Sequence, residues 1–177
     1  MKGIAARYRH GSDITLYGLK RTIVELMTQF PVYRTYINSE VSRESDPSYI
    51  KEAVKRSIER APDLLNELDF IERFILLDFE DYLTREEKEQ WIHFVMRFQQ
   101  FTGPLMAKGF EDTVLYVYNR LLSLNEVGGS PDRFGTSLKE FHSLNRKRGN
   151  LYPHSLNATS THDTKRGEDV RARLNVL

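Results

Sequence analysis

Apolar side chains recur at helical spacing along most of the chain. Such spacing, at i, i+3, i+4 and i+7, is typical of amphipathic helices that bury one face. The stripes lie within residues 16–30, 50–61, 64–75, 91–98 and 114–122. Strand-like stretches are short, at 32–37 and 156–160. The pattern predicts a mainly α fold, a helical assembly of about six helices with one or two short strands.

Helix start and stop signals agree with these stripes. Candidate signals are Ser12 or Thr15 as the first cap, Asp46 before Pro47, capping boxes at 84–87 and 137–140, and closing prolines at Pro31 and Pro62. Two segments rich in glycine and proline, 101–109 and 126–135, are predicted to be loops.

Charged side chains gather in residues 158–174, which hold one histidine, three carboxylates and four basic side chains. His162 and Asp163 follow the predicted strand at 156–160 and precede a predicted helix at 168–177. Loops at this end of a strand carry the chemistry of most barrel enzymes. From the motif alone, a hydrogen-bonded turn or helix cap is the commoner interpretation of such a Thr-His-Asp sequence.

The longer run Ser-Thr-His-Asp-Thr-Lys-Arg-Gly-Glu-Asp at 160–169 resembles the fourth conserved region of the maltooligosyltrehalose synthases, a family of the α-amylase clan (glycoside hydrolase family 13). Three further blocks resemble the same family in the same order. They are 30–36, 98–120 with its Thr-Gly-Pro and Glu-Asp-Thr elements, and 123–135. The resemblance therefore covers essentially the whole chain.

This resemblance implies a segment of a larger (β/α)8-barrel enzyme. Residues 1–149 would form an inserted helical domain, and residues 150–177 a strand-turn-helix piece of the catalytic barrel. The family isomerises the reducing-end α-1,4 bond of maltooligosaccharides to an α,α-1,1 bond by intramolecular transglycosylation. It needs no cofactor, and no metal site is expected here.

The resemblance also implies roles for individual residues. Asp163 would stabilise the oxocarbenium-like transition state, and His162 would hydrogen-bond the same sugar ring. Lys165 and Lys108 are implied at the acceptor sugar, and Glu111, Asp112 and Arg166 are further candidates for substrate binding. From spacing alone four of them also fit structural roles: Lys108 as a solvated loop lysine, Glu111 and Asp112 as acidic residues at a helix start, and Arg166 in ion pairs that brace the turn.

The other two catalytic carboxylates of the clan are missing. The nucleophile lies on a Gly-x-Arg-x-Asp strand end and the acid on a Glu-bearing strand end, and neither pattern occurs. We therefore expect the chain to be inactive alone. Because the last helical pattern stops at Leu177 without a cap, we also expect it to be cut from a longer protein. The alternatives are a freestanding non-catalytic helical module that binds glucan or a partner protein, and a remnant of a disrupted gene.

Composition narrows the partners. The 177 residues carry 26 basic and 25 acidic side chains and a formal net charge of +1, which favours neither nucleic acid nor an anionic membrane as a partner. There is no cysteine, so disulfides and thiol chemistry are excluded. The expected partners are a maltooligosaccharide or glucan and the remainder of the catalytic barrel. The expected location is cytoplasmic.

Overall fold

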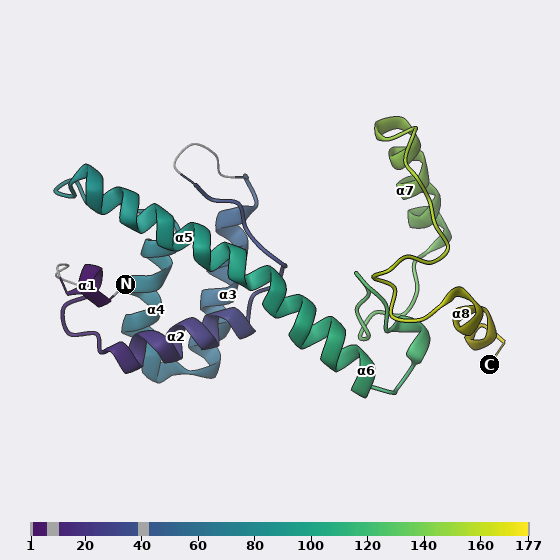
Figure 1. Ribbon diagram of the computed structural model, residues 1–177, viewed down its shortest axis with the longest axis horizontal. Helices are drawn as coiled ribbons and strands as arrows, with labels where there is room; N and C mark the ends of the chain where they lie inside the picture. Colours follow the sequence, from purple (N-terminus) through teal and green to yellow (C-terminus); the bar gives the residue numbers. More distant parts are fainter. Residues whose placement is uncertain (1, 7–10, 39–42, 177) are drawn as a thin grey trace. The chain divides into compact units, whose positions relative to one another are not determined.

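The computed structural model describes residues 2–6, 11–38 and 43–176 and is mainly helical (Figure 1). The chain divides into two compact units, Met1–Met106 and Ala107–Leu177. The predicted fold class is confirmed in its helical character. The proposed division at residue 149, with a barrel piece after it, stays a prediction.

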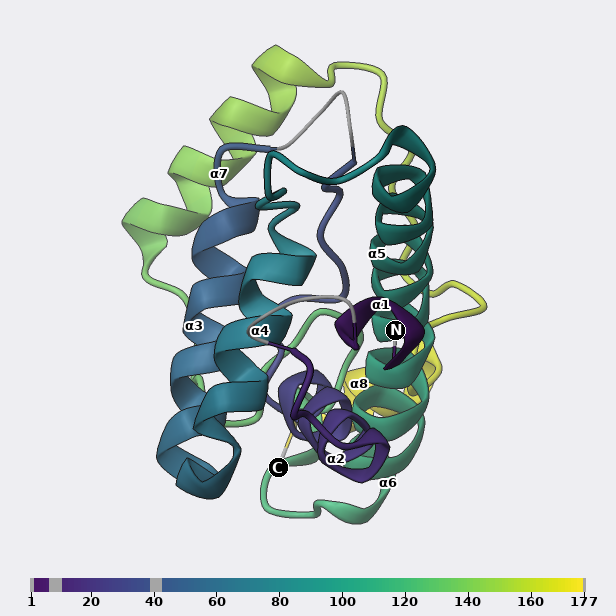
Figure 2. The ribbon, with the colours of Figure 1, turned by 90° about the vertical axis from the view of Figure 1, so that its left-hand side faces the viewer.

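The first unit is a small helical bundle. Its elements are α1 (Lys2–Ala5), α2 (Leu16–Thr28), α3 (Asp46–Arg60), the 3-10 turn η1 (Pro62–Leu64), α4 (Leu65–Ile75) and α5 (Arg85–Met106). Helix α4 packs against α3, α2 and α5, and Figure 2 shows α3 and α4 running side by side. Two predicted helix starts are confirmed. The Thr15 hydroxyl accepts the Gly18 amide at 2.9 Å, and Thr84 and Glu87 form a reciprocal capping box.

Aromatic rings fill the centre of this unit. The Phe74 side chain is fully buried and stacks on Trp91 with ring centroids 4.2 Å apart. The Phe94 ring meets Phe74 edge-on at 5.3 Å, and Phe79 meets Trp91 edge-on at the same distance. The indole N–H of Trp91 also donates to the Phe74 carbonyl, so the buried ring leaves no unsatisfied donor. This cluster joins α4 to α5.

The strand predicted at 32–37 is wrong. The backbone there is irregular, and side chains satisfy it in place of a neighbouring strand. Buried Gln99 of α5 accepts the Ile37 amide at 2.7 Å and donates to the Ile37 carbonyl at 2.8 Å. Asp46 accepts the Tyr36 amide at 2.9 Å. Because one amide side chain offers both a donor and an acceptor, it replaces a pair of ladder bonds.

The loop predicted at 101–109 is also wrong, because helical backbone continues past Gly103 and Pro104 to Met106. A proline inside a helix removes one backbone hydrogen bond, a cost that tertiary packing can override. Phe98, Gln99 and Thr102 are buried just before it, so this part of α5 is fixed by packing. The π-helix η2 (Ala107–Val114) begins directly afterwards.

The second unit has short elements. After η2 come α6 (Leu115–Val117), the 3-10 turn η3 (Leu122–Leu124), α7 (Leu138–Leu151) and α8 (Glu168–Leu174). The predicted capping box at the start of α7 is confirmed between Ser137 and Glu140. The strand predicted at 156–160 is wrong, since the described backbone there is irregular and Leu156 is fully exposed. A strand needs a neighbouring backbone to complete its ladder, and none of the described residues provides one.

Across the described residues, none of the helices combines the length and the apolar content needed to cross a bilayer.

Candidate functional site

His162 and Asp163 lie at the tip of a closed turn in the second unit. The turn is closed by Thr164, whose amide and hydroxyl donate to the Thr161 carbonyl at 3.2 and 2.7 Å. The Ser160 and Thr164 hydroxyls are 3.0 Å apart. The His162 Nδ1 and the Asp163 Oδ1 are 3.5 Å apart. Both side chains are exposed to solvent, His162 by 101% and Asp163 by 84%. The sequence prediction of a turn here is correct.

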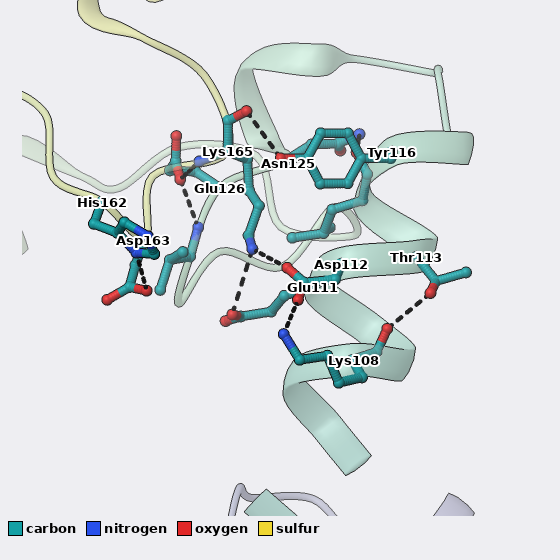
Figure 3. A network of polar contacts seen from close by, with 12 residues as sticks. Lys108, Glu111, Asp112, Thr113, Tyr116, Asn125, Glu126, His162, Asp163 and Lys165 are labelled. Atoms are coloured by element: carbon teal, nitrogen blue, oxygen red, sulfur yellow. Dashed lines mark hydrogen bonds and ion pairs between the residues drawn. The ribbon is translucent and has the colours of Figure 1, made fainter. Parts of the chain in front are cut away.

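Lys165 lies directly after this turn and points inward. Its ammonium is 2.7 Å from the Asp112 carboxylate and 3.9 Å from Glu111, and its side chain is only 7% exposed. Lys108 reaches the other oxygen of Asp112 at 2.5 Å (Figure 3). Two sequence motifs more than fifty residues apart therefore meet, the first on η2 and the second on the turn.

The network is held in its charged form. Hydrogen bonds from Lys108 and then Lys165 lower the pKa of Asp112 to about 2, from an ordinary 3.8. The hydrogen bond to Asp112 in turn raises the pKa of Lys165 above its usual value. Both shifts have the sign expected for opposite charges that favour each other's ionised form.

Arg166 points to the end of the helical segment that carries this network. Its guanidinium donates to the Leu115 carbonyl at 3.5 Å and to the Asn125 carbonyl at 3.3 Å. The side-chain NH₂ group of Asn125 donates to the Leu115 and Tyr118 carbonyls. A buried side chain and a cation together therefore satisfy backbone carbonyls at the end of α6. Cations and donors at a helix C-terminus stabilise it through its unpaired carbonyls and its dipole.

Tyr116 and Glu126 complete the surroundings of the turn. The Tyr116 ring lies 5.2 Å from the Arg166 guanidinium, and its hydroxyl donates to the Lys165 carbonyl at 3.3 Å. The Glu126 carboxylate accepts the Lys165 amide at 2.6 Å. Sequence reasoning assigned no role to Asn125 or Glu126. Their place inside the resembling block at 123–135 was the one signal that could have pointed to them.

The structure thus brings together five of the predicted site residues, Lys108, Glu111, Asp112, Lys165 and Arg166. His162 and Asp163 lie on the same turn but point away from that network, as Figure 3 shows. The result is a network of ion pairs that supports a turn, and this turn exposes an imidazole and a carboxylate. Their roles towards a substrate stay predictions.

The depressed pKa of Asp112 predicts an acid-sensitive network. Since the folded pKa lies below the unfolded value, the stability from this group is present above about pH 4. It is lost as pH falls through about 2. A side-chain ¹³C NMR titration should place the Asp112 midpoint near 2, and Lys108→Met should raise it. A midpoint near 4 in the unchanged chain would contradict the ion-paired arrangement.

Comparisons with known proteins point to one enzyme, although no family model matches the chain. A putative maltooligosyl trehalose synthase of Mycobacterium tuberculosis is 55% identical over 82 residues, which is 46% of this chain and 11% of that protein. The solved structure of maltooligosyltrehalose synthase from Arthrobacter ramosus superposes with a TM-score of 0.71 at 32% identity. It covers 97% of this chain and 20% of that one. A mutant form of the same enzyme gives a TM-score of 0.68 at 33% identity, over 88% of this chain and 18% of that one.

This chain therefore spans about a tenth to a fifth of the length of the relatives it matches. The resemblance seen in the sequence motifs is confirmed by both the sequence and the structural comparisons. The chain is similar to a segment of maltooligosyltrehalose synthase, in sequence over 82 residues and in fold over 97% of its length.

Proposed function

We propose that this chain is part of an enzyme that isomerises the reducing-end α-1,4 bond of a maltooligosaccharide to an α,α-1,1 bond. The observation that carries the proposal is the contact of Lys165 with Asp112 at 2.7 Å. It joins two of the blocks that carry the family resemblance, 98–120 and 160–169. The proposed reaction is an intramolecular transglycosylation without a cofactor, and the proposed location is cytoplasmic.

Asp163 is the proposed transition-state stabiliser. A carboxylate next to the reacting sugar favours the positive charge that develops on an oxocarbenium-like ring, and it can accept ring hydroxyls. The exposed carboxylate of Asp163 is available for such contacts, as is the His162 imidazole beside it. The nucleophile and the general acid would come from barrel strands of the longer protein.

Lys108 and Lys165 differ in their access to a sugar. Both ammonium groups are bonded to Asp112, but the Lys108 side chain is 77% exposed, whereas that of Lys165 is 7% exposed. Lys108 is therefore the better placed of the two to grip the acceptor glucose while that ring turns. Glu111, Asp112 and Arg166 would support Lys108 indirectly, by keeping the charged groups of the network in place. Such a grip raises the rate by orienting the attacking hydroxyl and excluding water.

The proposal is tested with maltopentaose by following the loss of reducing ends. This chain alone should give no turnover, because two of the three carboxylates are absent. A chimera in which the chain replaces its matching segment of the Arthrobacter ramosus enzyme should regain turnover. Turnover by the chain alone, or a folded chimera without turnover, would contradict the proposal.

The alternative of a freestanding non-catalytic module is not favoured. Nearly the whole chain, 97% of it, superposes on a segment of one enzyme.

A further inference from the structure

Glu126 links two segments that lie 39 residues apart in the sequence. Its Oε1 accepts the Lys165 amide at 2.6 Å and its neighbour's amide, that of Val127, at 2.9 Å. Hydrogen bonds from backbone amides to a carboxylate are charge-assisted and stronger than neutral ones. Glu126 is therefore bonded to the backbone directly after the His162–Asp163 turn.

The charge on Glu126 is favoured by its surroundings. Burial, the largest single influence, raises the pKa of Glu126, but the amide bonds of Lys165 and Val127, together with Arg171 and the Arg166 amide, leave the pKa below its ordinary value. Arg171 of α8 adds electrostatic attraction, and the Arg166 amide contributes in the same direction. The carboxylate is thus an anion at neutral pH, and it accepts a hydrogen bond from the backbone next to the turn.

The loop that presents Glu126 is tightly folded. The Glu126 carbonyl accepts the Gly129 amide at 2.8 Å, and Gly128 has a positive φ of 72°. A Cβ on Gly129 would lie 2.7 Å from the Leu124 carbonyl oxygen, closer than any side chain tolerates. The path of the loop therefore requires glycine at both positions, and this path brings the Glu126 carboxylate to Lys165.

Two other anchors of the turn act on side chains, and a third, the Tyr116 hydroxyl, donates to the Lys165 carbonyl at 3.3 Å. Asp112 bonds the Lys165 ammonium, and the α6 terminus bonds the Arg166 guanidinium. Long side chains of this kind can rotate about several bonds while the backbone moves. Glu126 differs from the side-chain anchors because it accepts the Lys165 backbone amide, two residues from Asp163, and this bond of 2.6 Å is shorter than the one from Tyr116.

We propose that Glu126 is a positioning residue which, through the Lys165 amide, fixes the direction in which the His162–Asp163 tip points. Thr164 transmits this constraint, since its amide and hydroxyl close the turn on Thr161. The proposal rests on the proposed function only for the role of the tip in sugar chemistry. The positioning itself is a property of this chain and can be measured in it.

The experiment is a pH titration of the ¹H–¹⁵N amide signals of this chain between pH 2.5 and 7. The Lys165 amide should shift with a midpoint below the ordinary glutamate value, and the His162 and Asp163 amides should follow with the same midpoint. In Glu126→Gln this shared step should vanish while the turn stays largely in place, because a neutral amide oxygen still accepts a hydrogen bond. In Glu126→Ala the Lys165 amide should exchange with solvent about tenfold faster or more, as expected when a charge-assisted hydrogen bond is lost.

Glu140→Gln is the matched control. Glu140 also accepts a backbone amide, that of Ser137, in the same unit but at the start of α7. This variant should leave the Lys165 step unchanged. A shared step that persists in Glu126→Gln, or a Lys165 exchange rate that Glu126→Ala leaves unchanged, would overturn the proposal.

In the chimera, Glu126→Ala should lower kcat about tenfold with little change in KM, and Glu126→Gln should recover part of the loss. An unaltered kcat would overturn the positioning role. If the unmutated chimera is inactive, the proposed function fails, whereas the amide titration still decides whether Glu126 holds the turn.

Discussion

Phe74→Ala should lower the free energy of unfolding of the first unit by about 3–5 kcal/mol, the range for truncating a fully buried phenylalanine. The ring touches three other aromatic rings, Phe70, Trp91 and Phe94, with centroid separations of 5.8, 4.2 and 5.3 Å. Its removal leaves a cavity whose walls include the rings of Phe70, Trp91 and Phe94. Because the Trp91 ring loses its stacking partner and stays held by its N–H bond to the backbone, the cavity cannot close easily.

Denaturant unfolding followed by tryptophan fluorescence measures this loss. Trp91 is the single tryptophan of the chain and lies in the first unit, so its signal reports on that unit. Phe101→Ala is the matched control, since it makes the same change on α5 at a side chain that is 58% exposed. It should cost less than about 1 kcal/mol. Equal costs for the two variants would show that the aromatic cluster does not hold the unit together.

Asp163→Asn should lower kcat of the chimera about 10²–10³-fold or more while leaving its folding unchanged. The substitution removes the negative charge proposed to stabilise the developing cation, and losses of this size accompany removal of one preorganised stabilising group. Stability should be unaffected because the carboxylate is 84% exposed and its side-chain partner is the equally open His162.

Initial rates with maltopentaose and thermal unfolding curves of the same samples separate the two effects. Asp132→Asn is a matched change in the exposed loop before α7, and it should alter neither quantity because asparagine keeps an acceptor for the Ser130 hydroxyl. If Asp163→Asn kept more than a tenth of the rate, the carboxylate would not be the transition-state stabiliser. If it unfolded the protein, the loss of rate would have a structural cause.

The helices were predictable because their signals are local. Thr15, Thr84 and Ser137 cap helices as expected from their spacing to the residues they serve. The errors occur where distant residues decide the backbone. Gln99 bonds the Ile37 backbone 62 residues away, and packing of α5 carries its helix through Pro104. No short sequence window contains either partner.

The candidate site was predicted in its membership and not in its arrangement. Family resemblance placed Lys165 and Asp112 in the same site, yet the sequence gives no sign that they bond each other. Nor does it indicate that Lys165 is largely covered while Lys108 stays open. The role of Glu126 could not be predicted, because a single glutamate in a Gly-rich loop forms no recognisable motif. Its contact is also with a backbone amide, which almost any residue could supply.

The π-helix η2 carries Lys108, Glu111 and Asp112. Its eight residues wind with the wider i→i+5 turn, and the Thr113 hydroxyl bonds the Lys108 carbonyl five positions back. Loss of one residue would return the segment to α-helical winding. Consecutive residues of an α-helix are about 100° apart around its axis, so the residues beside the deletion would turn relative to each other. Asp112 would then face away from Lys165. Across the evolutionary history of this segment, insertions and deletions should therefore be excluded from Ala107–Val114.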